Sequence, residues 1–252
     1  MNTITLPTEA QKRSTGCLPA GLFARVYDPF LWLAERRGLR THRGEVLAEA
    51  RGLTLEIGSG TGLNLPHYPR SLEGLVLAEP DAAMRARLQY RLRDLEQPAS
   101  VSDAVAERLP FADGTVDTVV STLVLCTVED PHLALREIGR VLAPDGQLLF
   151  IEHVRAGSRA RARWQDRLEA PWCAFAGGCR CNRPTLTLMA ECGFAFDVSE
   201  AAWRGMPAIV KPLVYGRAEY VEQASRQPGV EAGARRFPAT AASPGDSGLL
   251  PN

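Results

Sequence analysis

Segments of strand length alternate with segments of helical periodicity along most of this chain. Residues 118–125 form a run without polar–apolar alternation, which is typical of a central parallel strand because helices cover both of its faces. Between such runs, apolar residues recur at helical spacing, as at Met84 and Leu88. Alternation of this kind predicts an α/β protein with a doubly wound, seven-stranded, mostly parallel sheet. The predicted strands are residues 53–57, 72–78, 100–103, 118–125, 147–154, 194–201 and 208–215.

The same pattern divides the chain into one domain and two tails. Residues 21–223 are expected to form the domain, with an N-terminal helical cap at 21–50 and a helix-bearing insert at 155–183. Residues 1–20 and 224–252 are polar or rich in Pro, Gly, Ala and Ser, so both are expected to be disordered.

Prolines set the expected helix ends. Pro29 interrupts the aromatic stretch of the cap, so two short helices are expected there. A further helix is expected to begin near Thr61, where Pro66 and Pro69 keep it short.

Composition excludes several classes of function. The 252 residues carry a formal net charge of zero, so no electrostatic field favours nucleic acid or an anionic surface. The chain has no apolar run of the roughly 18–20 residues that a membrane span needs, and no secretory signal. Six cysteines in a chain of this length do not indicate a disulfide scaffold. A cytoplasmic protein without an integral membrane anchor is expected.

A glycine-rich turn follows the first predicted strand. Gly58, Gly60 and Gly62 let the backbone adopt positive φ and pass close to a ligand, and Ser59 lies between them. Their spacing differs from the Gly-x-Gly-x-x-Gly of dinucleotide sites. Glu56, just before the turn, would repel a pyrophosphate but suits a cationic ligand. A turn without any ligand is the alternative.

Glu79 strengthens the ligand hypothesis. It lies about twenty residues beyond the glycines, at the end of the second predicted strand, where a carboxylate accepts the hydroxyls of a ribose. A solvated surface glutamate is the alternative.

Three longer motifs resemble known proteins. Leu55-Glu-Ile-Gly-Ser-Gly-Thr-Gly62, Leu109-Pro-Phe-Ala-Asp-Gly-Thr-Val-Asp117 and Arg140-Val-Leu-Ala-Pro-Asp-Gly146 are similar to the successive motifs of class I S-adenosylmethionine-dependent methyltransferases of the ubiquinone/menaquinone type. Ser121-Thr-Leu-Val-Leu-Cys-Thr-Val128, Glu152-His-Val154 and the block from Trp172 to Phe194 resemble the thiol S-methyltransferase branch. The resemblance implies a Rossmann-like class I methyltransferase fold and S-adenosyl-L-methionine as cofactor.

The resemblance also implies a role for each site residue. Glu56 and the glycine turn would hold the methionine end of the cofactor, while Glu79, beside Pro80, would hold the ribose. Related domains often place an acid before the position of Ala106, where this chain has Val105, so Asp103 or Glu107 is the candidate acceptor for the adenine amino group. The cofactor-binding residues implied are Glu56, Gly58, Ser59, Gly60, Gly62, Glu79, Pro80, Met84, Ala106, Glu107, Ser121 and Thr122.

His153, at the end of the fifth predicted strand, is the candidate catalytic residue. Its ordinary pKa near neutrality suits a general base or a group that orients the acceptor, and a structural histidine is the alternative. Cys126 is expected to be a small buried residue. The cysteines at 173, 179, 181 and 192 lack the spacing of zinc ligands, so no metal is expected.

These observations favour methyl transfer to a small, largely apolar acceptor. A thiol is the preferred acceptor because part of it is already thiolate at neutral pH, and the sequence offers few bases. The alternatives are O- or C-methylation of a quinone-like compound or natural product, and a cofactor-binding partner protein without catalysis. No nucleic-acid partner is expected.

Overall fold

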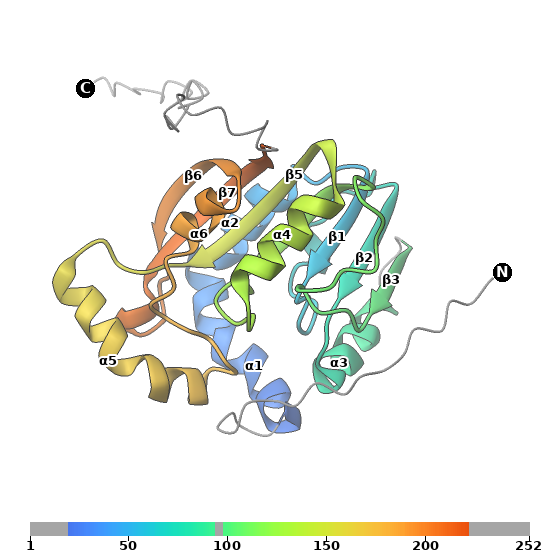
Figure 1. Cartoon of the computed structure of the whole chain (residues 1–252). Helices are drawn as coiled ribbons and strands as arrows, with labels where there is room; N and C mark the ends of the chain where they lie inside the picture. Colours follow the sequence, from blue (N-terminus) through green and yellow to red (C-terminus); the bar gives the residue numbers. More distant parts are fainter. Residues whose placement is uncertain (1–19, 94–97, 222–252) are drawn as a thin grey trace, which may run out of the picture.

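The computed structural model describes residues 20–93 and 98–221 (Figure 1). The tails expected to be disordered lie outside these residues, except for Ala20, which begins the first helix.

Seven strands form a single sheet in the order β3-β2-β1-β4-β5-β7-β6. Strands β1 to β5 pair in parallel, and β7 is inserted antiparallel between β5 and β6. The predicted fold class is therefore confirmed. The strands are β1 Leu53–Ile57, β2 Gly74–Ala78, β3 Ala99–Ser102, β4 Val116–Thr122, β5 Leu142–His153, β6 Phe194–Ala202 and β7 Pro212–Tyr220.

Helices cover both faces of the sheet, with α4 in front and α1 and α2 behind it in the view of Figure 1. Successive residues of β4 point to opposite faces, so Val119 joins one apolar core and Val120 the other. The helices are α1 Ala20–Ala34, a π-helical turn η1 Glu35–Leu39, α2 Arg40–Leu47, α3 Ala82–Leu92, α4 Pro131–Val141, α5 Arg159–Phe175 and α6 Thr185–Glu191, with short 3-10 turns at Leu65–His67 and Ala208–Val210.

The helical cap differs from the sequence prediction. Helix α1 continues through Pro29, so the prediction that this proline divides it is wrong. The break lies instead at Gly38, whose φ of 128° is outside the helical range. Glycine adopts this conformation without a Cβ penalty, which explains why the direction changes there.

Several further boundaries were predicted incorrectly. The last strand was expected at residues 208–215, but Ala208–Val210 is a 3-10 turn and β7 begins at Pro212. The helix expected from Thr61 is only the 3-10 turn at Leu65–His67. Strand β4 ends at Thr122, before the predicted Leu125, because Leu123 has a φ of 59°. The chain therefore leaves the sheet at Leu123 and makes a tight turn over the carboxyl edge of the sheet.

Candidate functional site

The glycine turn lies at the carboxyl end of β1 and requires its glycines. Gly58, Gly60 and Gly62 have φ angles of 56°, 57° and 86°. A Cβ on Gly58 would lie 2.6 Å from Val124 Cγ2, and one on Gly62 would lie 2.8 Å from Leu88 Cδ1. The turn therefore passes close to both neighbouring segments, and no larger residue fits at these two positions without displacement.

Glu79 is tied directly to this turn. Its Oε2 accepts a hydrogen bond from the backbone N–H of Gly60 at 2.8 Å, and its Oε1 accepts one from Asp81 N–H at 2.8 Å. Burial raises the pKa of Glu79, and these two N–H donors oppose the rise. Each carboxylate oxygen keeps acceptor capacity beyond one hydrogen bond, so the group suits paired hydroxyls.

Glu56 lies in a buried polar network. Its Oε1 accepts from Asn64 Nδ2 at 2.9 Å, and its Oε2 accepts from the hydroxyl of Tyr68 at 2.7 Å. Asn64 Oδ1 in turn accepts from Arg43 Nη1 at 2.6 Å. Burial raises the pKa of Glu56 from 4.5 to about 7, and the hydrogen bonds from Tyr68 and Asn64 oppose the rise. The group therefore titrates near neutral pH.

The helical cap contributes residues that the sequence reasoning missed. Arg43 is buried in α2 and also donates to Glu35 of the η1 turn, at 2.9 Å from Nη2. Arg43 and Asn64 thereby connect the cap to Glu56. In the sequence, the sign of this contact is an arginine that shares a helix face with apolar residues. That pattern does not show which residue the arginine contacts.

Tyr27 of α1 lies over the site. It lines a small cavity of about 10 Å³ together with Glu56, Gly58 and Thr122. Burial raises the pKa of Tyr27; Arg43 lowers it, while Glu79 and Cys126 add to the rise. Tyr27 is therefore close to the glycine turn, to Glu79 and to the loop that follows β4.

The remaining predicted cofactor residues occupy the same edge of the sheet, with different partners. Thr122 Oγ1 accepts from Asn64 Nδ2 at 3.0 Å, so it joins the Glu56 network. The Ser121 hydroxyl donates to Glu152 Oε1 at 2.8 Å, away from the turn. Glu107 accepts the backbone N–H of Glu129 at 2.9 Å, in the loop beyond β4.

The residues expected on the adenine side of the cofactor lie beyond Glu79 in the chain. Pro80 is exposed immediately after it, and Met84 is buried in the first turn of α3. Asp81 caps this helix by accepting from Ala83 N–H and Met84 N–H. Ala106 is buried after β3.

Glu152, which the sequence analysis named in a motif but gave no role, supports the loop after β4. It is completely buried, and its Oε1 accepts the N–H groups of Val124 and Leu125 at 2.9 and 3.1 Å. Burial raises its pKa, while those N–H donors oppose the rise. A glutamate inside the apolar stretch of β5 was the available signal, because such a group needs partners when buried.

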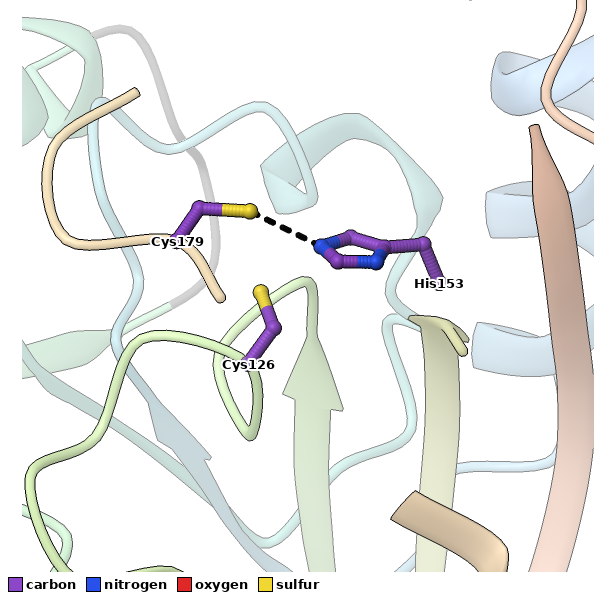
Figure 2. A group of neighbouring side chains, drawn as sticks. All are labelled: Cys126, His153 and Cys179. Atoms are coloured by element: carbon purple, nitrogen blue, oxygen red, sulfur yellow. Dashed lines mark hydrogen bonds between the residues drawn. The ribbon is translucent and has the colours of Figure 1, made fainter. Parts of the chain in front are cut away.

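His153 is buried beside two cysteines (Figure 2). Its Nε2 lies 2.9 Å from Cys179 Sγ, and its ring stacks on Trp203 with the centroids 5.9 Å apart. Burial lowers the pKa of His153, but the neighbouring Cys179 outweighs this, and the pKa is raised overall. Cys126 Sγ completes a group whose three ligand-type atoms lie within 4.8 Å of one another.

The other cysteines considered by spacing are separate from this group. Cys181 Sγ lies 3.5 Å from the backbone oxygen of Gln165, and Cys192 Sγ lies 3.6 Å from His132 Nδ1. Among the described residues, only Cys179 of the four cysteines at 173, 179, 181 and 192 belongs to a group of three possible metal ligands. No metal was expected from the spacing of the four cysteines at 173, 179, 181 and 192. The fold instead brings together Cys126, His153 and Cys179.

Within the described ranges, none of the helices has the length and apolar character required to span a membrane.

Comparisons with known proteins identify the family. Residues 55–150 match the family described as methyltransferase domain. The human thiol S-methyltransferase TMT1B is 33% identical over 177 residues, which cover 64% of this chain and 72% of that protein. The human thiol S-methyltransferase TMT1A is 32% identical over 173 residues, covering 65% of this chain and 69% of that protein.

Solved structures show the same fold at lower identity. A SAM-dependent methyltransferase of Thermotoga maritima, described as a possible histamine N-methyltransferase, aligns with a TM-score of 0.60 and 21% identity over 80% of this chain and 97% of that one. Geranyl diphosphate C-methyltransferase of Streptomyces coelicolor aligns with a TM-score of 0.55 and 15% identity over 73% of this chain and 78% of that one.

Proposed function

This chain belongs to the class I S-adenosylmethionine-dependent methyltransferases, and we propose that it methylates the sulfur of a small, largely apolar thiol. S-adenosylmethionine is its methyl donor. When bound, the cofactor supplies an electrophilic methyl group, and the protein supplies alignment and exclusion of water.

The chemistry of the residues fits this cofactor. The carboxylate of Glu56 would attract the cationic amino group of the methionine end, beside Gly58, Ser59, Gly60 and Gly62. Glu79 would accept the ribose hydroxyls, since its two oxygens are held by backbone N–H donors in a fixed orientation. The further residues proposed at the cofactor are Pro80, Met84, Ala106, Glu107, Ser121 and Thr122.

The observation that best supports a thiol is that the possible bases already have hydrogen-bond partners within the protein. At the carboxyl end of β5, His153 faces Cys179, and Glu152 is held by Ser121 and backbone N–H groups. An alcohol or phenol would need a well-positioned base, whereas a thiol with a pKa near about 8.5 is partly ionised at neutral pH. Similarity to proteins named thiol S-methyltransferases, at 33% identity, supports the same acceptor class.

A quinone-like acceptor is the second candidate. It is favoured by a 36% identity over 103 residues to a ubiquinone/menaquinone biosynthesis C-methyltransferase of Haemophilus ducreyi, which covers 39% of this chain. Such a reaction would form a C–CH₃ bond in place of an S–CH₃ bond.

Matched acceptor pairs separate the two candidates. The purified protein is given methyl-labelled cofactor with hexanethiol or hexanol, thiophenol or phenol, and a short-chain quinol. We expect label in the two thiols at rates at least about tenfold above those of their oxygen analogues. Label in phenol or quinol without label in either thiol would refute the proposal, and no label in any acceptor, with cofactor bound, would favour a protein without catalysis.

A further inference from the structure

Cys126, His153 and Cys179 bring three metal-type ligand atoms to one point in the fold. They come from the loop after β4, the end of β5 and the loop after α5, and their ligand atoms lie within 4.8 Å of one another. Figure 2 shows His153 Nε2 directed toward the two sulfur atoms. All three residues are buried, with exposed fractions of 1%, 1% and 7%.

The surroundings of Cys179 favour a sulfur that accepts hydrogen bonds. Trp172 Nε1 lies 3.1 Å from Cys179 Sγ, and an indole N–H can only donate. Metal-bound thiolates commonly accept such hydrogen bonds from outer residues, which orient the ligand and tune the metal.

The loops that hold the two cysteines are fixed to each other. The backbone N–H of Arg180 donates to the carbonyl oxygen of Cys126 at 2.9 Å. Arg183 Nη1 donates to the carbonyl oxygens of Leu125 and Val128 at 2.6 and 2.9 Å, and these two hydrogen bonds support the loop after β4. The two sulfurs are therefore positioned by backbone hydrogen bonds and by a buried arginine.

The loop after β4 also retains a strained residue. Leu123 has a φ of 59° and is the one non-glycine residue of positive φ in the described part of the chain. A non-glycine residue in this conformation is strained, and such strain concentrates at active sites and ligand sites. Leu123 N–H donates to the carbonyl oxygen of Ile151 at 2.8 Å, so surrounding contacts hold the loop in this course three residues before Cys126.

Cys181 shows how a packing cysteine differs. It is completely buried two residues after Cys179, but its sulfur lies against the backbone oxygen of Gln165, and within the described residues it belongs to no group of three possible metal ligands. A buried thiol is therefore not by itself part of a cluster of ligand atoms. Cys181 provides a matched control for substitutions of Cys126 and Cys179.

We propose that Cys126, His153 and Cys179 bind a Zn²⁺ ion whose fourth coordination position takes the sulfur of the acceptor thiol. Zn²⁺ prefers tetrahedral sulfur and nitrogen ligands at about 2.3 and 2.0–2.1 Å, and zinc sites with three protein ligands keep the fourth position for water or substrate. Tetrahedral angles with these bond lengths separate nitrogen from sulfur by roughly 3.5 Å. The observed 2.9 Å between His153 Nε2 and Cys179 Sγ therefore has to open by well under one ångström.

The charges and protons balance. Binding of Zn²⁺ displaces the S–H protons of Cys126 and Cys179 to solvent, while His153 coordinates as neutral imidazole. Two thiolates and Zn²⁺ give a neutral centre, which suits a buried position. The acceptor R–SH then replaces bound water and releases its proton, and its sulfur forms the new S–CH₃ bond as the C–S bond to the cofactor sulfonium breaks. The neutral thioether product is a weaker ligand than the thiolate and leaves.

The role of the fourth position rests on the proposed function, but the metal site does not. The test therefore measures the metal directly. Full-length protein, purified under reducing conditions without a metal-affinity column, is analysed for zinc per chain, and the zinc is then replaced by Co²⁺. Thiolate-to-Co²⁺ absorption reports cysteine ligands, and visible bands report the coordination geometry. The variants are Cys126→Ser and Cys179→Ser, with Cys181→Ser as the control.

We expect about one metal per chain in the wild type and in Cys181→Ser, and loss of the Co²⁺–thiolate absorption in the other two variants. Trp172→Phe should weaken Co²⁺ binding about 10–100-fold while keeping an aromatic ring in place. Addition of hexanethiol should shift the visible bands, whereas hexanol should not. Folded wild-type protein that takes up neither metal, or equal metal in all variants, would refute the site.

Two other outcomes are distinguishable. If Co²⁺ binds with the expected ligands but no thiol shifts its bands, the role of the fourth position is wrong. If the protein methylates only phenols or quinols, the proposed function is wrong while the metal measurements still stand. Because the wild-type titration needs no variant, a cysteine variant that fails to fold does not prevent a decision.

Discussion

The carboxylate of Asp28 in α1 accepts a hydrogen bond from the hydroxyl of Thr61 in the glycine turn, with 2.6 Å between Oδ1 and Oγ1. The second carboxylate oxygen accepts from Arg91 Nη2 of α3 at 2.7 Å. Asp28 thus fastens α1 to the glycine turn and to α3. Tyr27, the neighbouring residue, lines the cavity at that turn, which is only about 10 Å³. Sites for small molecules are usually about 300–1,000 Å³, so we expect α1 or the Tyr27 side chain to shift when the cofactor binds.

Asp28→Asn should therefore accelerate exchange of the cofactor. The substitution removes the charge that holds Arg91 and weakens the bond to Thr61, so α1 opens more easily. We expect association and dissociation rates of S-adenosylmethionine to rise several-fold in stopped-flow measurements, with a smaller change in affinity. Asp166→Asn is the control, because it removes a carboxylate on α5 that pairs with Arg155 far from the glycine turn in the sequence. Unchanged rates in Asp28→Asn would show that this contact does not limit access.

Glu79→Ala should weaken cofactor binding. A carboxylate that accepts ribose hydroxyls makes hydrogen bonds worth about 1.5–3 kcal/mol each, and about 1.4 kcal/mol changes affinity tenfold. We expect titration calorimetry to show a loss of tenfold to a few hundredfold. Glu79 also accepts the N–H of Gly60, so circular dichroism is needed to show that the turn still folds. The exposed Glu73, changed to Ala, should leave affinity intact, and equal affinity in both variants would remove Glu79 from the site.

Glu56 should make stability depend on pH near neutrality. Burial raises its pKa from 4.5 to about 7, so the folded state binds this proton more tightly than the unfolded state. The resulting stabilisation is fully present below about pH 4.5 and is lost as pH rises through about 7. Since one pKa unit corresponds to 1.36 kcal/mol, the loss is on the order of 3 kcal/mol.

Glu56→Gln removes this titration and keeps the shape of the side chain. Denaturant unfolding at pH 5 and pH 8 should show a decline for the wild type that is absent or smaller in the variant, by about 3 kcal/mol at most. The histidines contribute equally to both proteins, so the difference isolates Glu56. Parallel pH profiles would mean that Glu56 is ionised in the folded protein throughout this range.

The parts of the site that depend on neighbouring residues could be predicted from sequence. The glycine turn follows an apolar run, and Asp130 before Pro131 is a local signal for a helix start, where Asp130 accepts the N–H of Leu133 at the start of α4. Such signals act over a few residues, where backbone conformation and capping determine the structure. Strand existence and sheet class followed from the same kind of local pattern.

The parts that depend on distant residues could not be predicted. Arg43 reaches Asn64 across 21 residues, and His153 reaches Cys179 across 26. No spacing rule relates such pairs, because the order of strands in the sheet decides which loops meet. Cys181 and Cys192 are near Cys179 in the sequence, whereas the pairing of β4 with β5 brings Cys126 and His153 beside Cys179 in the fold.

The approach of Gly58 to Val124 joins the glycine turn to the loop that holds Cys126. A Cβ at Gly58 would lie 2.6 and 2.8 Å from the two γ-carbons of Val124, so Gly58→Ala has to displace that side chain or the loop. Gly114 provides a matched control, since its φ is also positive, at 67°, but a Cβ there would meet nothing within 4 Å. Gly114→Ala should cost about 1–2 kcal/mol from backbone strain alone. Gly58→Ala should cost a further 1–3 kcal/mol or so from overpacking.

Val124→Ala should partly rescue Gly58→Ala, because it removes the atoms that clash. In a double-mutant cycle measured by denaturant unfolding, we expect a favourable coupling of about 1–3 kcal/mol between these two positions and none between Gly114 and Val124. The reaction provides a second readout, since displacement of the loop after β4 should lower kcat in Gly58→Ala more than cofactor affinity. Additive stabilities in the cycle would show that the turn and the loop adjust independently, and the effect on kcat would then have to arise within the glycine turn itself.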